Sequence, residues 1–372
     1  MSYNKQQKTN SKYKQHFILD KSILLQLKII LFYIIFINLI RYVNNYETKI
    51  YLKIKGNGTQ IILNNTFSFF PSKVLVNDFE NIQCNYTCYF EKETNNITLI
   101  FNQAITSCSN MFRELNSITE VDLSDFDNSN SNSLFAMFYR CSNLEKINFG
   151  NINTSQVANM QSLFSGCSKL TTIDLSNFDT SIVTNMNYLF RDCLNLTSLN
   201  LSSFNTSKVS TMINMFISCN RLEKIDFGNI NTSSAINMTR FFYGCSKLSY
   251  INLTNFNFSN IKDMSYMFYK CSKLEKIDFG NINTSSVENM KYLFSGCSTL
   301  TNINLTNFNT SKVTNMNFMF NDCSSLTSID LSYLDFSNVK YMSYMLNGCS
   351  KLESINFGNI NTSSVEDRKS VV

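Results

Sequence analysis

The sequence predicts an α/β solenoid, a stack of about ten units of 26 residues, each a strand, a turn and a helix, with a parallel sheet on one face. A fixed period in this range marks a supersecondary unit that buries its apolar face against its neighbours. The period is clearest in the cysteines, which recur every 26 residues without insertion or deletion at Cys141, Cys167, Cys193, Cys219, Cys245, Cys271, Cys297, Cys323 and Cys349. Apolar residues recur in the same register, so the whole unit repeats.

Four parts follow from this register. Residues 1–20 form a polar tail, residues 21–40 an apolar transmembrane or signal segment, and residues 41–110 an N-terminal cap that does not match the repeat. Residues 111–372 form the solenoid of 26-residue repeats. A cap is expected because the open end of a repeat column must be covered.

The apolar segment is about as long as a membrane-spanning helix and carries few polar residues. Lysines precede it, which favours an N-terminus that stays inside the cell. Three interpretations remain open: an uncleaved type II anchor, a cleaved export signal, and a buried helix of a soluble protein. The first two predict a protein that is membrane-anchored at the cell surface or secreted, with its repeats outside the cytosol.

Within each unit the apolar residues change their spacing. Between Leu170 and Leu175 they end in a period of two around a β-branched residue, which predicts a short strand. Beyond Ser181 they fall three or four residues apart, which predicts one face of a helix with Ser181 as its N-cap. That face consists of Val183, Met186, Leu189, Phe190 and Cys193. A strand and a short helix in every unit give a leucine-rich-repeat-like stack.

The repeat also resembles a known family. Read from Cys167 to Phe190 it is C-S-x-L-T-x-I-D-L-S-N-F-D-T-S-x-V-T-N-M-x-x-L-F, which is similar to the 26-residue repeat of bacterial surface proteins, the BspA-like leucine-rich-repeat group. The resemblance covers residues 111–372 and implies a surface-exposed, non-catalytic solenoid linked to adhesion and host contact. Some members of the group are lipoproteins. The first cysteine here is Cys84, well beyond the apolar segment, so a protein anchor is favoured over a lipid anchor.

The sequence offers few residues or motifs that could form a catalytic or metal site. The one histidine, His16, lies in the polar tail, so the repeats can form no histidine-dependent triad, acid–base pair or zinc site. Glycine-rich motifs that bind phosphate are also missing. We therefore expect no catalytic residue, no metal and no cofactor. Residues 1–41 hold seven cations against Asp20, which leaves the repeats nearly neutral and argues against a nucleic-acid partner.

The nine aligned cysteines, the structural Cys ladder, are interpreted as buried free thiols that close the apolar face of each unit. Occasional disulfides and a metal site are the alternatives. In this interpretation a serine in place of Cys245 would leave an unpaired hydroxyl in an apolar column. Cys84, Cys88 and Cys108 lie outside the ladder, and a disulfide among them is expected in an exported cap.

One column of the predicted strands alternates between aspartate and asparagine without exception, at Asp122, Asn148, Asp174, Asn200, Asp226, Asn252, Asp278, Asn304, Asp330 and Asn356. Adjacent carboxylates at the spacing of a parallel stack would repel each other, and alternation separates them. The column is therefore either a ladder in which Asn amides donate to neighbouring carboxylates, or a repetitive strip that binds a cation, a glycan or a protein.

The adjoining outward column carries Lys224, Tyr250 and Lys276 near its centre, and these residue types anchor interfaces. The candidate partner-binding face consists of Lys224, Tyr250, Lys276, Asp226, Asn252 and Asp278.

Asn-x-Ser/Thr sequons recur after the strand, at Asn153, Asn205, Asn231, Asn257, Asn283, Asn309 and Asn361. They predict either glycan acceptors of a secreted glycoprotein or residues that suit the turn itself. Both interpretations remain open.

The function predicted from these features is adhesion, or protein or glycan binding, through the extended face of a non-catalytic cell-surface or secreted repeat protein. Its partners would be a protein or glycan ligand and, through the N-terminal segment, the membrane. The alternative is an intracellular leucine-rich-repeat scaffold or regulatory module whose apolar N-terminal stretch is structural.

Overall fold

The computed structural model describes residues 26, 28–35, 46–81 and 83–367. Residues 28–35 are helical and belong to a unit, Met1–Tyr46, that is separate from the compact unit Glu47–Val372. Among the described residues, no helix is long and apolar enough to cross a membrane. Much of the apolar segment 21–40 falls outside the described residues, so its role as an anchor or signal stays a prediction.

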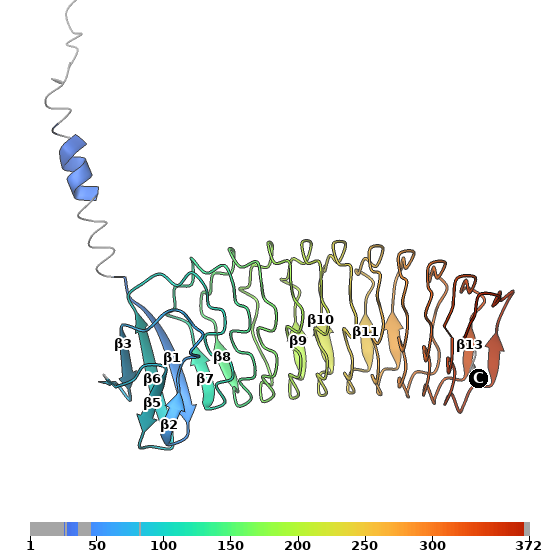
Figure 1. The fold of residues 1–372 in the computed structure, drawn as a ribbon, viewed down its shortest axis with the longest axis horizontal. Coiled ribbons are helices and arrows are strands. Elements are labelled where there is room, and N and C mark those ends of the chain that lie inside the picture. The colour runs from blue at the N-terminus through green and yellow to red at the C-terminus, as the bar shows by residue number, and fades with distance from the viewer. Residues whose placement is uncertain (1–25, 27, 36–45, 82, 368–372) are drawn as a thin grey trace, which may run out of the picture. The chain divides into compact units, whose positions relative to one another are not determined.

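The cap is an antiparallel sheet that continues into the solenoid (Figure 1). Its strands follow the order β4-β3-β6-β1-β7-β8, and β2 pairs with β5 in a separate two-stranded sheet. Strand β1 pairs with β6 on one side and with β7 on the other, both antiparallel, whereas β7 and β8 are parallel. The bounds are β1 (Thr48–Lys55), β2 (Gly58–Ile61), β3 (Lys73–Val76), β4 (Phe79–Glu80), β5 (Thr87–Phe90), β6 (Thr94–Phe101), β7 (Ile118–Asp122) and β8 (Lys146–Asn148).

The solenoid is a stack of about nine turns joined by parallel pairing at a register of 26 residues (Figure 1). Short strands pair two by two: β7 with β8, β9 with β10, β11 with β12, and β13 with β14. A second line of parallel bridges runs without interruption from Ser133 to Asp367. The remaining bounds are β9 (Ser198–Asn200), β10 (Lys224–Asp226), β11 (Tyr250–Asn252), β12 (Lys276–Asp278), β13 (Ser328–Asp330) and β14 (Ser354–Asn356).

The prediction of a helix in each unit is wrong. Among the described residues 46–81 and 83–367 there is no helix. The segment after Ser181 instead makes two tight turns, with Tyr188 and Asp192 in the left-handed region at φ 60° and 56°. Alternate backbone N–H groups donate to the next turn of the solenoid, as Tyr188 does to Ile213 at 2.9 Å. The N–H groups between them close local turns, as Leu189 does to Met186 at 3.3 Å. The fold is therefore a β-solenoid.

The spacing between turns explains this difference. Parallel strands lie about 4.8 Å apart, whereas packed helices need about 8–10 Å between their axes. Turns that bond to each other on both sides of the coil leave no room for a stacked helix. Within one coil, two successive tight turns of the backbone also place apolar residues inward, three or four positions apart. This is the spacing that suggested a helix.

Ser181 has a different role from the predicted N-cap. Its backbone N–H donates to the Asp179 carboxylate at 2.9 Å, which forms a turn that depends on the Asp side chain. The serine column thus marks a corner of the coil and starts no helix.

The core is a column of buried apolar side chains that runs the length of the repeats. Its centre is a stack of phenylalanine rings whose adjacent centroids lie 5.4 to 5.9 Å apart, with planes inclined by at most 19°. Leu346 continues the column after the last ring and is also buried. The stacked rings are Phe112, Phe138, Phe164, Phe190, Phe216, Phe242, Phe268, Phe294 and Phe320.

Replacing a central ring should break this column in the middle. We expect Phe242→Ala to lower the free energy of unfolding by about 3–5 kcal/mol, because it leaves a cavity between Phe216 and Phe268. Phe242→Leu should cost clearly less, since a leucine already occupies the column at Leu346. Urea unfolding of both variants checks this. Equal losses would contradict the cavity argument, because leucine fills most of the volume that alanine leaves empty.

Candidate functional site

The Asp/Asn column ends each strand with a local turn. In all ten members the side-chain Oδ1 accepts the backbone N–H of the residue two positions later, at 2.8 to 3.2 Å. Bonding between turns is also present, as Asn148 Nδ2 donates to Asp122 Oδ1 at 3.0 Å. The first role of the column is therefore to bend the chain, which both Asp and Asn can do. The backbone N–H of Ser176 lowers the pKa of Asp174 through the same contact.

The candidate partner-binding face lies on β10, β11 and β12. Tyr250 on β11 is paired in register with Lys276 on β12, and Lys276 Nζ lies 5.9 Å from the centre of the Tyr250 ring. Lys224 on β10 is exposed. The structure thus brings Tyr250 and Lys276 together, while the side chains of Asp226, Asn252 and Asp278 each hold their own turn.

A small cleft opens beside this face, where strand pairing stops after β12. It has a volume of about 330 Å³ and lies between β12 and residues 302–304, which form no strand. Its walls include Lys276, Asp278, Asn302 and Asn304. The cleft extends the candidate face by one turn and gives it a polar recess.

The ladder cysteines are free in the structure, and each thiol donates to a buried backbone carbonyl. The acceptor is the stacked phenylalanine 29 residues earlier, at 2.8 to 3.2 Å, as from Cys167 to Phe138 O. Phe138 O also accepts the backbone N–H of Cys141 at 3.1 Å. Both lone pairs of this carbonyl are thus satisfied, one by each of two successive turns.

This contact overturns the expectation for serine at Cys245. The Cys245 thiol donates to Phe216 O at 3.2 Å, so a hydroxyl in its place would also have an acceptor. The side chains around Cys245 are apolar, but the Phe216 carbonyl that its thiol faces is a polar acceptor. Outside the ladder, Cys84 pairs with Cys88 in a disulfide and Cys108 is free and buried.

The ladder should resist alkylation in the native protein. Burial raises the pKa of the Cys245 thiol well above its usual value, and raises that of the half-buried Cys349 to about 11. The reactive thiolate is therefore scarce and shielded. We expect iodoacetamide to modify Cys349 first and the eight fully buried ladder positions only after unfolding, as read by mass spectrometry. Cys84 and Cys88 should stay unmodified without a reductant; rapid native labelling at Cys245 would contradict the buried ladder.

A threonine column that was not predicted from the sequence connects successive turns of the solenoid. The Thr206 hydroxyl donates to Asn231 O at 2.7 Å and accepts from Asn231 N at 3.1 Å. It thus bonds to both backbone groups of Asn231, as the N–H and carbonyl of a neighbouring strand would. Thr180 and Thr310 make the same pair of contacts. The recurrence of a threonine inside the sequons was the available signal. It predicted either glycan attachment or residues that suit the turn, and not a clip between successive turns of the solenoid.

Removing one of these hydroxyls should destabilise the stack. Thr206→Val keeps the shape of the side chain but leaves the Asn231 N–H and carbonyl without this partner, so we expect a loss of about 1–3 kcal/mol. Thr314→Val is the matched control, because the Thr314 hydroxyl is exposed and makes one contact, to Glu288 O at 3.2 Å. Chemical denaturation measures both, and equal effects would rule out the clip.

The sequon asparagines lie on the surface and also shape turns. All seven are exposed, and the Oδ1 of Asn205 accepts from the Ser207 backbone N–H at 3.1 Å. Their conformation suits the turn, and whether they carry glycans stays a prediction. Among the described residues, no group of three or more His, Cys, Asp or Glu side chains is placed to hold a metal ion.

Comparison with known families places the repeat. The model of one family, DUF285, described as Mycoplasma protein of unknown function, matches residues 83–193, 106–224, 169–280 and 271–372. The chain belongs to this family. The matches overlap along the solenoid, as expected for a repeat that fits the family model in several registers. No curated protein and no solved structure matches the chain.

Proposed function

We propose that the chain is an exported, non-catalytic repeat protein that holds a protein or glycan ligand along the outer face of its strands. The row of Lys224, Tyr250 and Lys276 carries this proposal. Tyr250 is 46% exposed and lies under Lys276, and aromatic and cationic side chains are the residues that anchor interfaces. A role in adhesion and membership of the BspA-like leucine-rich-repeat surface proteins belong to the same proposal, supported by the repeat from Cys167 to Phe190.

Export is supported by the two kinds of cysteine in the molecule. The Cys84–Cys88 disulfide is typical of an oxidising compartment and would be unusual in the cytosol. The ladder thiols suit the same compartment, because burial keeps them protonated and out of reach of oxidants. In this proposal the segment 21–40 acts as a type II anchor or as a signal, and the repeats lie outside the cell.

Protease treatment of intact cells tests the location. Trypsin added outside the cells should remove the repeats, while a cytosolic marker protein stays intact. Complete protection of the repeats until the cells are opened would instead support an intracellular scaffold.

The binding face is tested by removing its aromatic residue. Tyr250→Ala should reduce adhesion of cells that display the full-length chain to a mucin-coated surface by about tenfold or more, since a central aromatic anchor is lost. Tyr333→Ala is the matched control, because Tyr333 is similarly exposed at 49% but lies outside the row. Folding of both variants is checked by thermal unfolding. Equal adhesion of the two variants would reject this face as the ligand site.

A further inference from the structure

A second surface, formed by the corner of the turns near the ladder cysteines, carries an unusual charge. Over residues 213–221, 239–247, 265–273 and 291–299 the sequence has no acidic residue. The same segments hold six cations that are exposed or half-buried, which we call the basic corner: Arg221, Arg240, Lys247, Lys270, Lys273 and Lys291. Because the repeats as a whole are nearly neutral, this concentration of positive charge is local.

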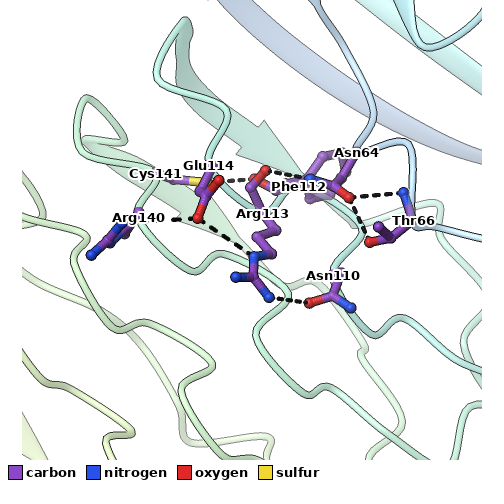
Figure 2. Close-up of polar contacts among 8 residues, drawn as sticks. All are labelled: Asn64, Thr66, Asn110, Phe112, Arg113, Glu114, Arg140 and Cys141. Atoms are coloured by element: carbon purple, nitrogen blue, oxygen red, sulfur yellow. Dashed lines mark hydrogen bonds and ion pairs between the residues drawn. The ribbon is translucent and has the colours of Figure 1, made fainter.

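The cations of the basic corner differ from those of the earlier turns. In the first turns Glu114 forms ion pairs with Arg113 at 3.6 Å and with Arg140 at 4.0 Å, as Figure 2 shows. Lys169 and Arg191 are likewise paired with acids. Within the described part of the chain, no cation of the basic corner forms an ion pair.

Lys270 makes the contrast direct, because it occupies the same place in its turn as Arg140, immediately before a ladder cysteine. Where Arg140 has Glu114 one turn earlier, Lys270 has Gly244, and one turn later it has Gly296. A Cβ atom at Gly296 would come within 3.2 Å of Lys270 Cγ, so a larger residue there would crowd the lysine. Neither equivalent neighbour of Lys270 in the adjacent turns has a side chain that could pair with its charge.

Tyrosine rings support these cations from below. Tyr243 stacks on Tyr269 at 4.7 Å and Tyr266 on Tyr292 at 4.7 Å, and Tyr266 lies 5.6 Å from Tyr269. The four tyrosines form one cluster, the tyrosine cluster. Arg240 lies 4.7 Å above the Tyr266 ring, and Lys270 lies 5.3 Å above the Tyr269 ring. Such contacts hold a cation in place without cancelling its charge.

We propose that the basic corner binds an acidic polysaccharide, a chain that carries sulfate or carboxylate groups. The cations meet the acidic groups, and the tyrosine hydroxyls at the ring edges bond to sugar hydroxyls. Tyrosine hydroxyls are protonated at neutral pH and can donate, and burial raises the pKa of Tyr266 and of Tyr292 further. The length of one sugar unit in an extended polysaccharide is similar to the spacing of adjacent turns of the solenoid. Successive sugar units can therefore contact successive turns. The inference goes beyond the proposed function, because it concerns a second surface, and it rests on that function only for exposure of the repeats to extracellular glycans.

Other polyanions fit this surface less well. A nucleic acid would stack its bases on exposed ring faces, but here the rings stack on one another and under cations. A bilayer surface would be met by apolar side chains that protrude beside the cations. The tyrosines of the cluster are half-buried, and none of the large apolar side chains that are exposed lies in the four segments.

A charge-matched pair of variants tests the site. In the full-length chain, Lys247→Ser with Lys273→Ser should weaken binding to heparin by about tenfold and lower the salt concentration that elutes the protein from heparin. The control is Lys169→Ser with Lys351→Ser, which removes two lysines from the same position of other turns and should change binding less than about twofold. Equal loss in both pairs, or a wild-type chain that does not bind heparin, would overturn the proposal.

Two further measurements separate a glycan from other polyanions. Wild-type protein should bind heparin more tightly than duplex DNA or phosphatidylserine vesicles at the same salt concentration, and preference for either of these would overturn the inference. Tyr266→Phe with Tyr269→Phe keeps the rings and the charge, and should still weaken heparin binding; unchanged binding would reject the glycan contact. These assays use purified protein, so they can fail while the Tyr250 adhesion test succeeds, and the reverse.

Discussion

The distance between successive turns is the constraint on which the rest of the structure depends. Backbone hydrogen bonding sets it near the spacing of parallel strands, on the strand side through pairs such as Tyr250 with Lys276 and on the opposite line through the bridges from Ser133 to Asp367. With both sides held at this spacing, equivalent residues must stack directly on each other. The phenylalanine rings then lie face to face, the thiols reach the carbonyl of the previous turn, and the threonine hydroxyls reach the next one.

This constraint also explains what the sequence could and could not predict. The 26-residue register, the inward apolar columns and the buried ladder position follow from spacing alone, because a repeat without insertions must align like with like. The helix did not follow. The separations of Val183, Met186 and Leu189 fit a helical face and also two successive tight turns, and nothing local distinguishes them. The decision lies in bonds between residues 25 apart, such as Tyr188 to Ile213, which a reading of one unit does not contain.

The polar columns illustrate the same limit. Alternation of Asp and Asn suggested contacts between turns, and the contact between Asn148 and Asp122 is of that kind. The requirement common to all ten positions is however local, since each side chain accepts an N–H two residues later. A reading from the sequence favoured the longer-range role because the alternation was visible, whereas the turn at each strand end was hidden inside a conserved spacing of the unit.

The left-handed corner places aromatic residues in several turns, and two tyrosines of the tyrosine cluster are among them. Equivalent positions of different turns all have positive φ there. Asn110, Ser162 and Asn214 fill some of them with small polar residues, whereas Tyr188, Phe318 and Tyr344 fill others with aromatic residues. Tyr266 and Tyr292 occupy the same conformation, at a cost of roughly 1–2 kcal/mol for each bulky residue. Stacking returns about 0.5–1.5 kcal/mol for each ring pair, and Tyr292 stacks on Phe318 at 4.4 Å as well as on Tyr266 at 4.7 Å. Stacking along the solenoid, which Phe318 and Tyr344 continue, therefore offsets the strain of an aromatic residue at this corner. What distinguishes Tyr266 and Tyr292 is the cation beside each ring. Among the residues that the structure describes, Arg240 and Lys291 form no ion pair, whereas Arg191, which lies over Tyr188, is paired with Asp192.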